Sequence, residues 1–167
     1  MKRSLLLVIL ASTVLANGCA TLQGLSALIQ APRFSEAPGR RAEIRLLPTS
    51  SANRLGGAGV RLWAEITNPN PFGFTLSTLR GTLFLDESRA TTVDFPLGMP
   101  LQAGGQTVVP IDLQFGFSEL PQLGNAIKRA LGNQPIDYRL ESTIGVDAGR
   151  FGTPVFGPMT LLRGTIQ

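Results

Sequence analysis

Hydrophobic and polar residues alternate with a period of two along much of the chain after residue 41, most clearly in segments 60–66 and 136–147. Successive side chains of a β-strand point to opposite faces, so this pattern predicts half-buried strands. The predicted inward residues are Val60, Leu62, Ala64 and Ile66 in the first segment, and Ile136, Tyr138, Leu140, Ile144 and Val146 in the second. A shift of one residue would bury the charged row, so the pattern also specifies the register.

Alternation also predicts strands at 43–46, 79–86 and 109–115, and two further strands are predicted at 90–95, after a hairpin turn, and at 155–166, the final segment. Residues that favour turns separate them. Proline lacks the N–H that a sheet ladder needs, so Asn68-Pro69-Asn70-Pro71 should end the strand before it. Asp86-Glu87-Ser88 should form a hairpin turn.

One stretch has helical spacing instead. Ser118 can cap a helix N-terminus, and Gly132 can end the helix. Between them, apolar residues recur at helical intervals, at Leu120, Leu123, Ile127 and Leu131. About seven strands and one short helix predict an all-β fold, an antiparallel β-sandwich.

The composition removes whole classes of chemistry. The 167 residues include no histidine, which excludes a histidine general base, a histidine metal ligand and any Ser-His or Cys-His nucleophile. The single cysteine, Cys19, allows neither an internal disulfide nor a cysteine metal cluster. The acidic pair Asp86-Glu87 is interpreted as a solvated turn. The sequence therefore predicts no catalytic residue, no metal site and no cofactor.

The charge distribution argues against a nucleic-acid partner. The net charge of +4 falls to +2 once Lys2 and Arg3 are removed with the leader segment described next. The arginines are scattered along the chain, and the only adjacent basic pairs after the N-terminus are Arg40-Arg41 and Lys128-Arg129. Proteins that bind nucleic acids concentrate their basic residues on one face, and this sequence has no such cluster.

The N-terminus has the pattern of a secretory leader. Met1-Lys2-Arg3 is basic, and the apolar stretch 5–15 is shorter than the roughly 20 residues that span a bilayer. The small residues 16–18 before Cys19 resemble the processing site of bacterial lipoproteins. That resemblance implies a signal peptide over residues 1–18 and a lipidated Cys19, carrying acyl chains such as palmitate. The alternatives are a secreted protein with a free buried cysteine and an uncleaved anchor.

The resemblance to lipoproteins also predicts an address. The residue after the cysteine is Ala20, not the aspartate that resembles the signal for retention in the inner membrane of enteric bacteria. We therefore expect the protein at the outer membrane, facing the periplasm, and the cell surface is the alternative. Residues 19–40 are predicted to be a lipid anchor and flexible tether, because Pro32, Pro38 and Gly39 interrupt any helix. The folded domain is predicted over residues 41–167.

The strand ending at Asn68-Pro69-Asn70 belongs to a recognisable run. Residues 62–74 read Leu-Trp-Ala-Glu-Ile-Thr-Asn-Pro-Asn-Pro-Phe-Gly-Phe, and a second strand with Gly81 follows at 79–85. This order resembles the signature of the late embryogenesis abundant (LEA) type 2 family, also called the water-stress and hypersensitive-response (WHy) domain. The resemblance covers about residues 41–167. It implies a sandwich like an immunoglobulin or fibronectin type III domain, a link to desiccation and cold stress, and no known catalytic residue.

Three sets of residues are candidates for function, and each also has a structural interpretation. Asn68, Pro69 and Asn70 either hydrogen-bond the neighbouring loop or form a polar patch for clients or membrane. Trp63, on the polar face of its strand, is either a recognition residue or packs under the helix or a sheet edge. Phe72 and Phe74 either line a mouth between the sheets or fill the core.

The function predicted from these observations is a non-enzymatic, membrane-tethered lipoprotein that protects against stress. Its partners would be the membrane, reached through the N-terminal lipid, and envelope proteins or lipids bound by weak contacts. One alternative is an adaptor or assembly factor that binds a protein partner by strand-edge addition. Another is a carrier of an apolar ligand between the sheets.

Overall fold

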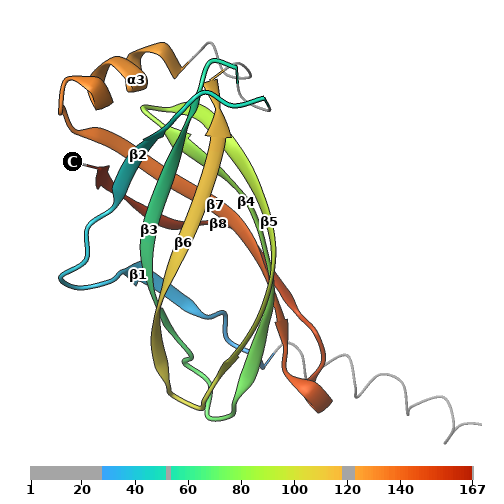
Figure 1. Ribbon diagram of the computed structural model, residues 1–167. Coiled ribbons are helices and arrows are strands. Elements are labelled where there is room, and N and C mark those ends of the chain that lie inside the picture. Colours follow the sequence, from blue (N-terminus) through green and yellow to red (C-terminus); the bar gives the residue numbers. More distant parts are fainter. Residues whose placement is uncertain (1–27, 52–53, 118–122, 167) are drawn as a thin grey trace, which may run out of the picture.

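A computed structural model describes residues 28–51, 54–117 and 123–166 (Figure 1). Most of these residues lie in β-strands, which are joined by turns, one α-helix and one short 3-10 helix. The elements in chain order are β1 (Arg33–Glu36), β2 (Glu43–Leu47), β3 (Gly57–Thr67), β4 (Phe74–Leu85), β5 (Ser88–Leu101), β6 (Gln106–Gly116), helix α3 (Gly124–Leu131), β7 (Ile136–Asp147), the 3-10 helix η3 (Gly149–Phe151) and β8 (Val155–Ile166).

The strands form two antiparallel sheets that pack face to face, as predicted. In one sheet β3 is central: β6 pairs with one side of it, and β1 and β2 share the other side. The second sheet has the order β5-β4-β7-β8. The turn after β5 carries the chain from the second sheet to the first, so β5 and β6 are edge strands that face each other across the sandwich (Figure 1).

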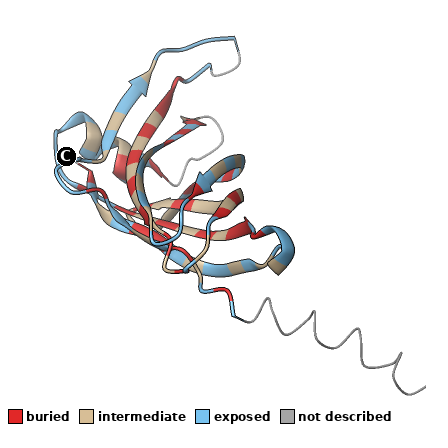
Figure 2. Cartoon of the chain, turned by 90° about the horizontal axis from the view of Figure 1, so that it is seen from below, coloured by how far each residue is buried: buried red, intermediate tan, exposed pale blue. Residues whose placement is uncertain are grey.

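The core lies between the sheets, and the predicted alternation identifies most of it. All nine residues predicted to point inward from 60–66 and 136–147 are at most 4% exposed. Figure 2 shows buried positions alternating with partly exposed ones along the strands, with exposed residues in the surrounding loops. Burial of these apolar rows is the main driving force for the fold.

The prediction of a flexible tether over residues 19–40 was wrong for its described part. Strand β1 lies inside that stretch and pairs with β3, with Phe34 opposite Ile66. Ile29 and Ala37 are buried in the same segment. Prolines and glycine did exclude a helix there, but they do not exclude a short edge strand. The described part of the sandwich therefore has eight strands rather than about seven.

Several strands are longer than predicted, and for β4 and β5 the reason can be identified. β4 begins at Phe74, whereas the pattern placed its start at Leu79. The first part of the strand escaped prediction because a bulge between Leu76 and Thr78 shifts the inward-facing residues from even to odd positions. β5 continues past residue 95 through Pro96 and Pro100. It lies at the edge of its sheet, where prolines are tolerated.

Helix α3 partly follows the sequence prediction. It ends at Gly132 as expected, and the Gly132 N–H donates to the carbonyls of Lys128 and Arg129. The predicted cap Ser118 and the apolar Leu120 lie outside the described residues. Leu131, predicted to face the core, is 67% exposed. Leu123 is buried and Ile127 packs against the core, as the spacing predicts, and Ala126 and Ala130 complete the buried stripe in place of Leu131.

A buried tyrosine ties β1 to the other sheet. The Tyr138 hydroxyl, on β7, donates a hydrogen bond to the Glu36 carboxylate at the end of β1. Tyr138 is 4% exposed, and burial, followed by the hydrogen bond and the charge of Glu36, raises the pKa of its hydroxyl. Residues 102 positions apart in sequence are thereby joined.

We expect Tyr138→Phe to lower the free energy of unfolding by about 1–2 kcal/mol near neutral pH, because Glu36 loses its donor. The raised pKa also predicts that the wild type loses stability as pH rises above 10. In that range Tyr138 ionises in the unfolded chain but stays protonated in the folded protein, so ionisation favours unfolding. Tyr138 is the only tyrosine, so the variant should lack this component. Urea unfolding at neutral and alkaline pH would measure both effects, and identical alkaline profiles would contradict the assignment.

Candidate functional site

The two asparagines of the Asn-Pro-Asn run form an internal clamp. Asn68 and Asn70 are 0% and 1% exposed. Asn68 Nδ2 donates to the carbonyls of Phe72 and Gln102, at 2.8 and 2.9 Å. Asn68 Oδ1 accepts the backbone N–H of Asn70 at 2.9 Å and its side-chain amide at 3.0 Å. Every polar atom of the Asn68 side chain is therefore used inside the protein.

Asn70 extends the clamp to the N-terminal segment. Its Oδ1 accepts the Gln30 N–H at 2.8 Å, and its Nδ2 donates to the Gln30 carbonyl at 2.9 Å. This two-way pairing imitates a rung of a sheet ladder. Asn70 thus holds the chain just before β1 against the loop between β3 and β4.

The clamp also joins two loops that cross between the sheets. The Asn68 N–H donates to the Gly105 carbonyl at 2.9 Å, and the Gly104 N–H donates to the Asn70 carbonyl at 3.1 Å. Loop 68–73 leads from β3 to β4, and loop 102–105 leads from β5 to β6. These bonds fix the two sheets to each other at this end, and they leave the side chains of Asn68 and Asn70 no free group for an external partner.

Trp63 lies on the outer face of the β3 sheet, among charged side chains. The Arg40 guanidinium stacks 4.6 Å from its ring centroid, and that of Arg61 lies at 6.0 Å. The indole is thus covered by a cation from the segment between β1 and β2, not by helix α3. It is half-buried, and its cationic cover leaves part of the ring accessible.

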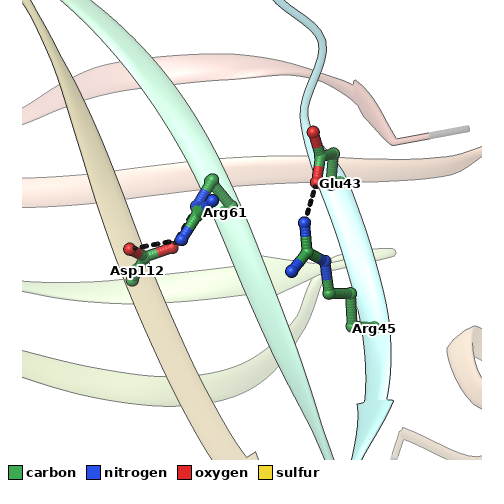
Figure 3. Close-up of polar contacts among 4 residues, drawn as sticks. All are labelled: Glu43, Arg45, Arg61 and Asp112. Carbon is green, nitrogen blue, oxygen red and sulfur yellow. Dashed lines mark hydrogen bonds and ion pairs between the residues drawn. The ribbon is translucent and has the colours of Figure 1, made fainter.

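Beside Trp63, two ion pairs extend across the same face (Figure 3). Arg61 on β3 binds Asp112 on β6 in a bidentate manner, at 2.6 and 3.0 Å, and Arg45 binds Glu43 along β2 at 2.8 Å. Hydrogen bonding from Arg61 lowers the pKa of the Asp112 carboxyl, although partial burial opposes the shift. These charges are solvated and mutually paired, so they provide no general acid or base.

The Arg61–Asp112 pair is exposed, so its expected effect is small. Asp112→Asn should destabilise the protein less than Tyr138→Phe does. Because the folded pKa of Asp112 is lowered, its contribution is present above the unfolded value near 3.9 and is lost as pH falls below it. The difference in urea midpoint between wild type and variant should therefore shrink as pH falls below about 4, and vanish once Asp112 is protonated in the folded state as well. A difference that persists in acid would contradict the ion-pair explanation.

An apolar slot opens between the edge strands β5 and β6. It has a volume of about 290 Å³ and is lined by Phe34, Ile66, Leu79, Phe95, Pro96, Leu97, Met99, Val109, Pro110, Ile111 and Asp112. The inward row of β5 is buried at Val93 and Leu101 but partly exposed at Phe95, Leu97 and Met99 between them. The sheets therefore part along this edge and leave large apolar side chains in contact with solvent.

The aromatic residues predicted for such a mouth lie elsewhere. Phe74 is 5% exposed and belongs to the core. Phe72 stacks on Phe151 of η3, with a centroid distance of 4.6 Å. The residues that line the slot escaped prediction because strand β5 was expected to end at Phe95. The alternating Phe95, Leu97 and Met99 were the available signal.

A polar hollow lies between α3 and the turn after β4. It measures about 680 Å³. Its main charged group, Asp86, accepts bonds from the Arg129 side chain at 3.1 Å and from the Asp137 N–H at 3.2 Å. Across the described ranges, no three histidine, cysteine, aspartate or glutamate side chains gather as a metal site. This hollow therefore has charges that pair with one another rather than a reactive centre.

The predicted lipidation site, Cys19, lies outside the described residues. Among the residues that are described, no helix has the length and apolar character needed to cross a membrane.

Comparison with solved structures finds proteins with a similar fold. The solution structure of an Arabidopsis thaliana protein aligns with a TM-score of 0.58 and 17% identity, over 83% of each chain. A second solution structure, of a late embryogenesis abundant (LEA) protein, aligns with a TM-score of 0.50 and 16% identity, over 96% of this chain and 86% of that one. At these identities the similarity is one of fold.

Sequence comparison is more specific. No curated protein matches the chain. The family described as late embryogenesis abundant protein matches residues 64–159, which is more than half of the chain and includes the asparagine clamp. This protein belongs to the late embryogenesis abundant protein family.

Proposed function

We propose that this protein is a non-enzymatic envelope lipoprotein of the WHy type, anchored through Cys19, that limits damage to envelope proteins and lipids during water loss. Membership of the late embryogenesis abundant family is the observation that carries the stress-related part of this proposal. The basic, apolar and small-residue order of segment 1–18 before Cys19 supports the anchor. The tether would concentrate the domain at the surface it protects.

The sheet edges support a role under dehydration. As water is lost, proteins are concentrated, and unpaired strand edges become sites of aggregation. Here the long edge strands carry prolines, which remove donors that an incoming strand would need: Pro96 and Pro100 in β5, Pro110 in β6 and Pro158 in β8. The remaining edges, β1 and β2, have four and five residues. These edges favour a domain that stays monomeric when concentrated, and they disfavour an adaptor that binds by strand addition.

Drying tests the proposal directly. The full chain, purified with its anchor and reconstituted in vesicles, should preserve the activity of a labile enzyme and the integrity of the vesicles through drying and rehydration. Cys19→Ala should protect the vesicles less, because it stays in solution. Protection no better than that given by an equal mass of albumin would contradict the protective role.

The proposed address, the outer membrane facing the periplasm, has its own test. Protease added to intact cells should leave the protein whole, and protease added after the outer membrane is opened should digest it. Digestion in intact cells would instead indicate the cell surface.

The apolar slot favours a second candidate function, carriage of an apolar chain between the sheets. The slot is close to the size of small-ligand pockets, and its lining is almost entirely aliphatic and aromatic. The one charged residue in the lining, Asp112, is already bound to Arg61. Such a slot would bind apolar chains in general, because it offers no free polar group to distinguish one ligand from another.

Neighbouring valines give a matched test of this second candidate. Val109 lines the slot, whereas Val108 lies on the opposite face of β6 and is 44% exposed. The wild type and Val108→Trp should bind a fluorescent analogue of palmitate, and Val109→Trp, which fills the slot, should not. Absence of binding by the wild type, or equal binding by both variants, would contradict carriage in the slot.

A further inference from the structure

One end of the sandwich differs from the rest of the surface in charge. We define this clamp end as residues 28–32, 68–73, 102–105 and 148–155, which are brought together around the Asn68 and Asn70 hydrogen bonds and the Phe72–Phe151 stack. Figure 1 shows the first described residues at the same end as η3 and these loops. The four segments contain no aspartate or glutamate, and their one charged residue is Arg150.

The clamp end also exposes apolar side chains. Leu28 is 70% exposed and Val155 is 67% exposed. The guanidinium of Arg150 lies 5.1 Å from the Phe151 ring, so cationic and aromatic groups are adjacent. The nearest carboxylate in sequence, Asp147, accepts the Gly149 N–H at 2.9 Å. Apolar and aromatic groups beside an arginine that forms no ion pair within the described part of the chain suit the interface of a bilayer with anionic lipids.

From these observations we propose that the clamp end lies against the membrane surface, with Leu28, Val155 and Arg150 in contact with lipid. This inference rests on the proposed anchor at Cys19. The partner is a phospholipid surface that includes anionic headgroups, and the clamp end is the part of the domain that faces it.

The length of chain before the described residues disfavours the opposite orientation, with the α3 end at the membrane. Nine residue steps separate Cys19 from Leu28, and a fully extended chain of that length reaches about 32 Å at most. The ten residue steps of strand β3 span about 33 Å from the clamp end to the end that carries α3. With the α3 end at the bilayer surface, the segment between Cys19 and Leu28 would have to be almost fully extended, at a cost in chain entropy. Asn70 strengthens this restriction because it pairs with Gln30 and fixes the point of attachment.

Two equally exposed positions allow a matched test. Val155 at the clamp end and Leu131 on α3 are each 67% exposed. The full chain carrying Val155→Cys or Leu131→Cys would be labelled with a fluorescent thiol reagent. It would then be reconstituted in vesicles of phosphatidylethanolamine and phosphatidylglycerol that contain spin-labelled lipid. We expect the dye at position 155 to be quenched several-fold more than the dye at position 131, and Arg150→Glu to reduce that quenching.

The same experiment separates the two proposals. If Cys19 is acylated, the unsubstituted chain takes up no thiol dye; uptake of one dye per chain would overturn the anchor. If Cys19 is blocked but positions 131 and 155 are quenched equally, or position 131 more strongly, the proposed orientation is wrong while the anchor stands.

Discussion

Asn68→Asp should lower the free energy of unfolding by about 4 kcal/mol, one of the largest effects expected of any single substitution in the domain. The change is nearly isosteric, but it replaces a donor that satisfies two buried carbonyls, those of Phe72 and Gln102, with an acceptor. An ionised carboxylate in a fully buried position is costly, and a protonated one still supplies only one donor. Urea unfolding monitored by the fluorescence of Trp63 would measure the loss.

The control for this variant is the same chemical change at an exposed position. Asn125→Asp, in the first turn of α3, should leave stability nearly unchanged, since Asn125 is exposed and an acidic residue is favourable near a helix N-terminus. If both variants unfold at the same urea concentration, the clamp contributes little and the run is not a structural signature.

Gly81→Ala should destabilise the domain by about 3 kcal/mol, because the sheet has no room for a side chain at that position. Gly81 lies opposite Ser142 on β7, and an added methyl group would overlap the Glu141 carbonyl and the Ser142 hydroxyl and come within 2.8 Å of the Ser142 Cβ. The backbone carbonyl cannot move without disturbing the ladder. The glycine in the second strand of the family signature is thus explained by close approach rather than by a turn.

Gly124→Ala is the matched control for Gly81→Ala. An added methyl group at Gly124 meets nothing within 4 Å. The residue begins α3, where alanine is the better helix former, so stability should rise by about 0.5 kcal/mol. Thermal unfolding of both variants should show opposite shifts in midpoint, and a tolerated Gly81→Ala would contradict the close pairing of β4 with β7 at this position.

Sequence patterns predicted the fold class because burial has a simple period within each regular strand. They failed to identify strand residues where that period breaks. In β4, the bulge after Leu76 changes which residues point inward, so the alternation is interrupted. The prolines of β5 led us to end the predicted strand six residues early, at residue 95. Prolines are acceptable in β5 because it lies at the edge of its sheet, and that position cannot be recognised from the local sequence.

The candidate site was harder to predict because its contacts are distant in sequence. Asn68 and Asn70 were recognisable as residues that hydrogen-bond a loop, but their partner Gln30 is 40 positions from Asn70. Nothing in residues 33–36 alone indicates that they pair with β3. The apolar slot depends on how far two sheets part, which alternation within single strands does not encode.

The most direct test of the account as a whole is the intact mass of the protein extracted from the membranes of cells that produce it. The account predicts a chain that begins at Cys19 and carries the added mass of acyl groups, and that leaves the membrane fraction in the Cys19→Ala variant. A chain of unmodified mass, whether it begins at Met1 or at Cys19, would contradict it.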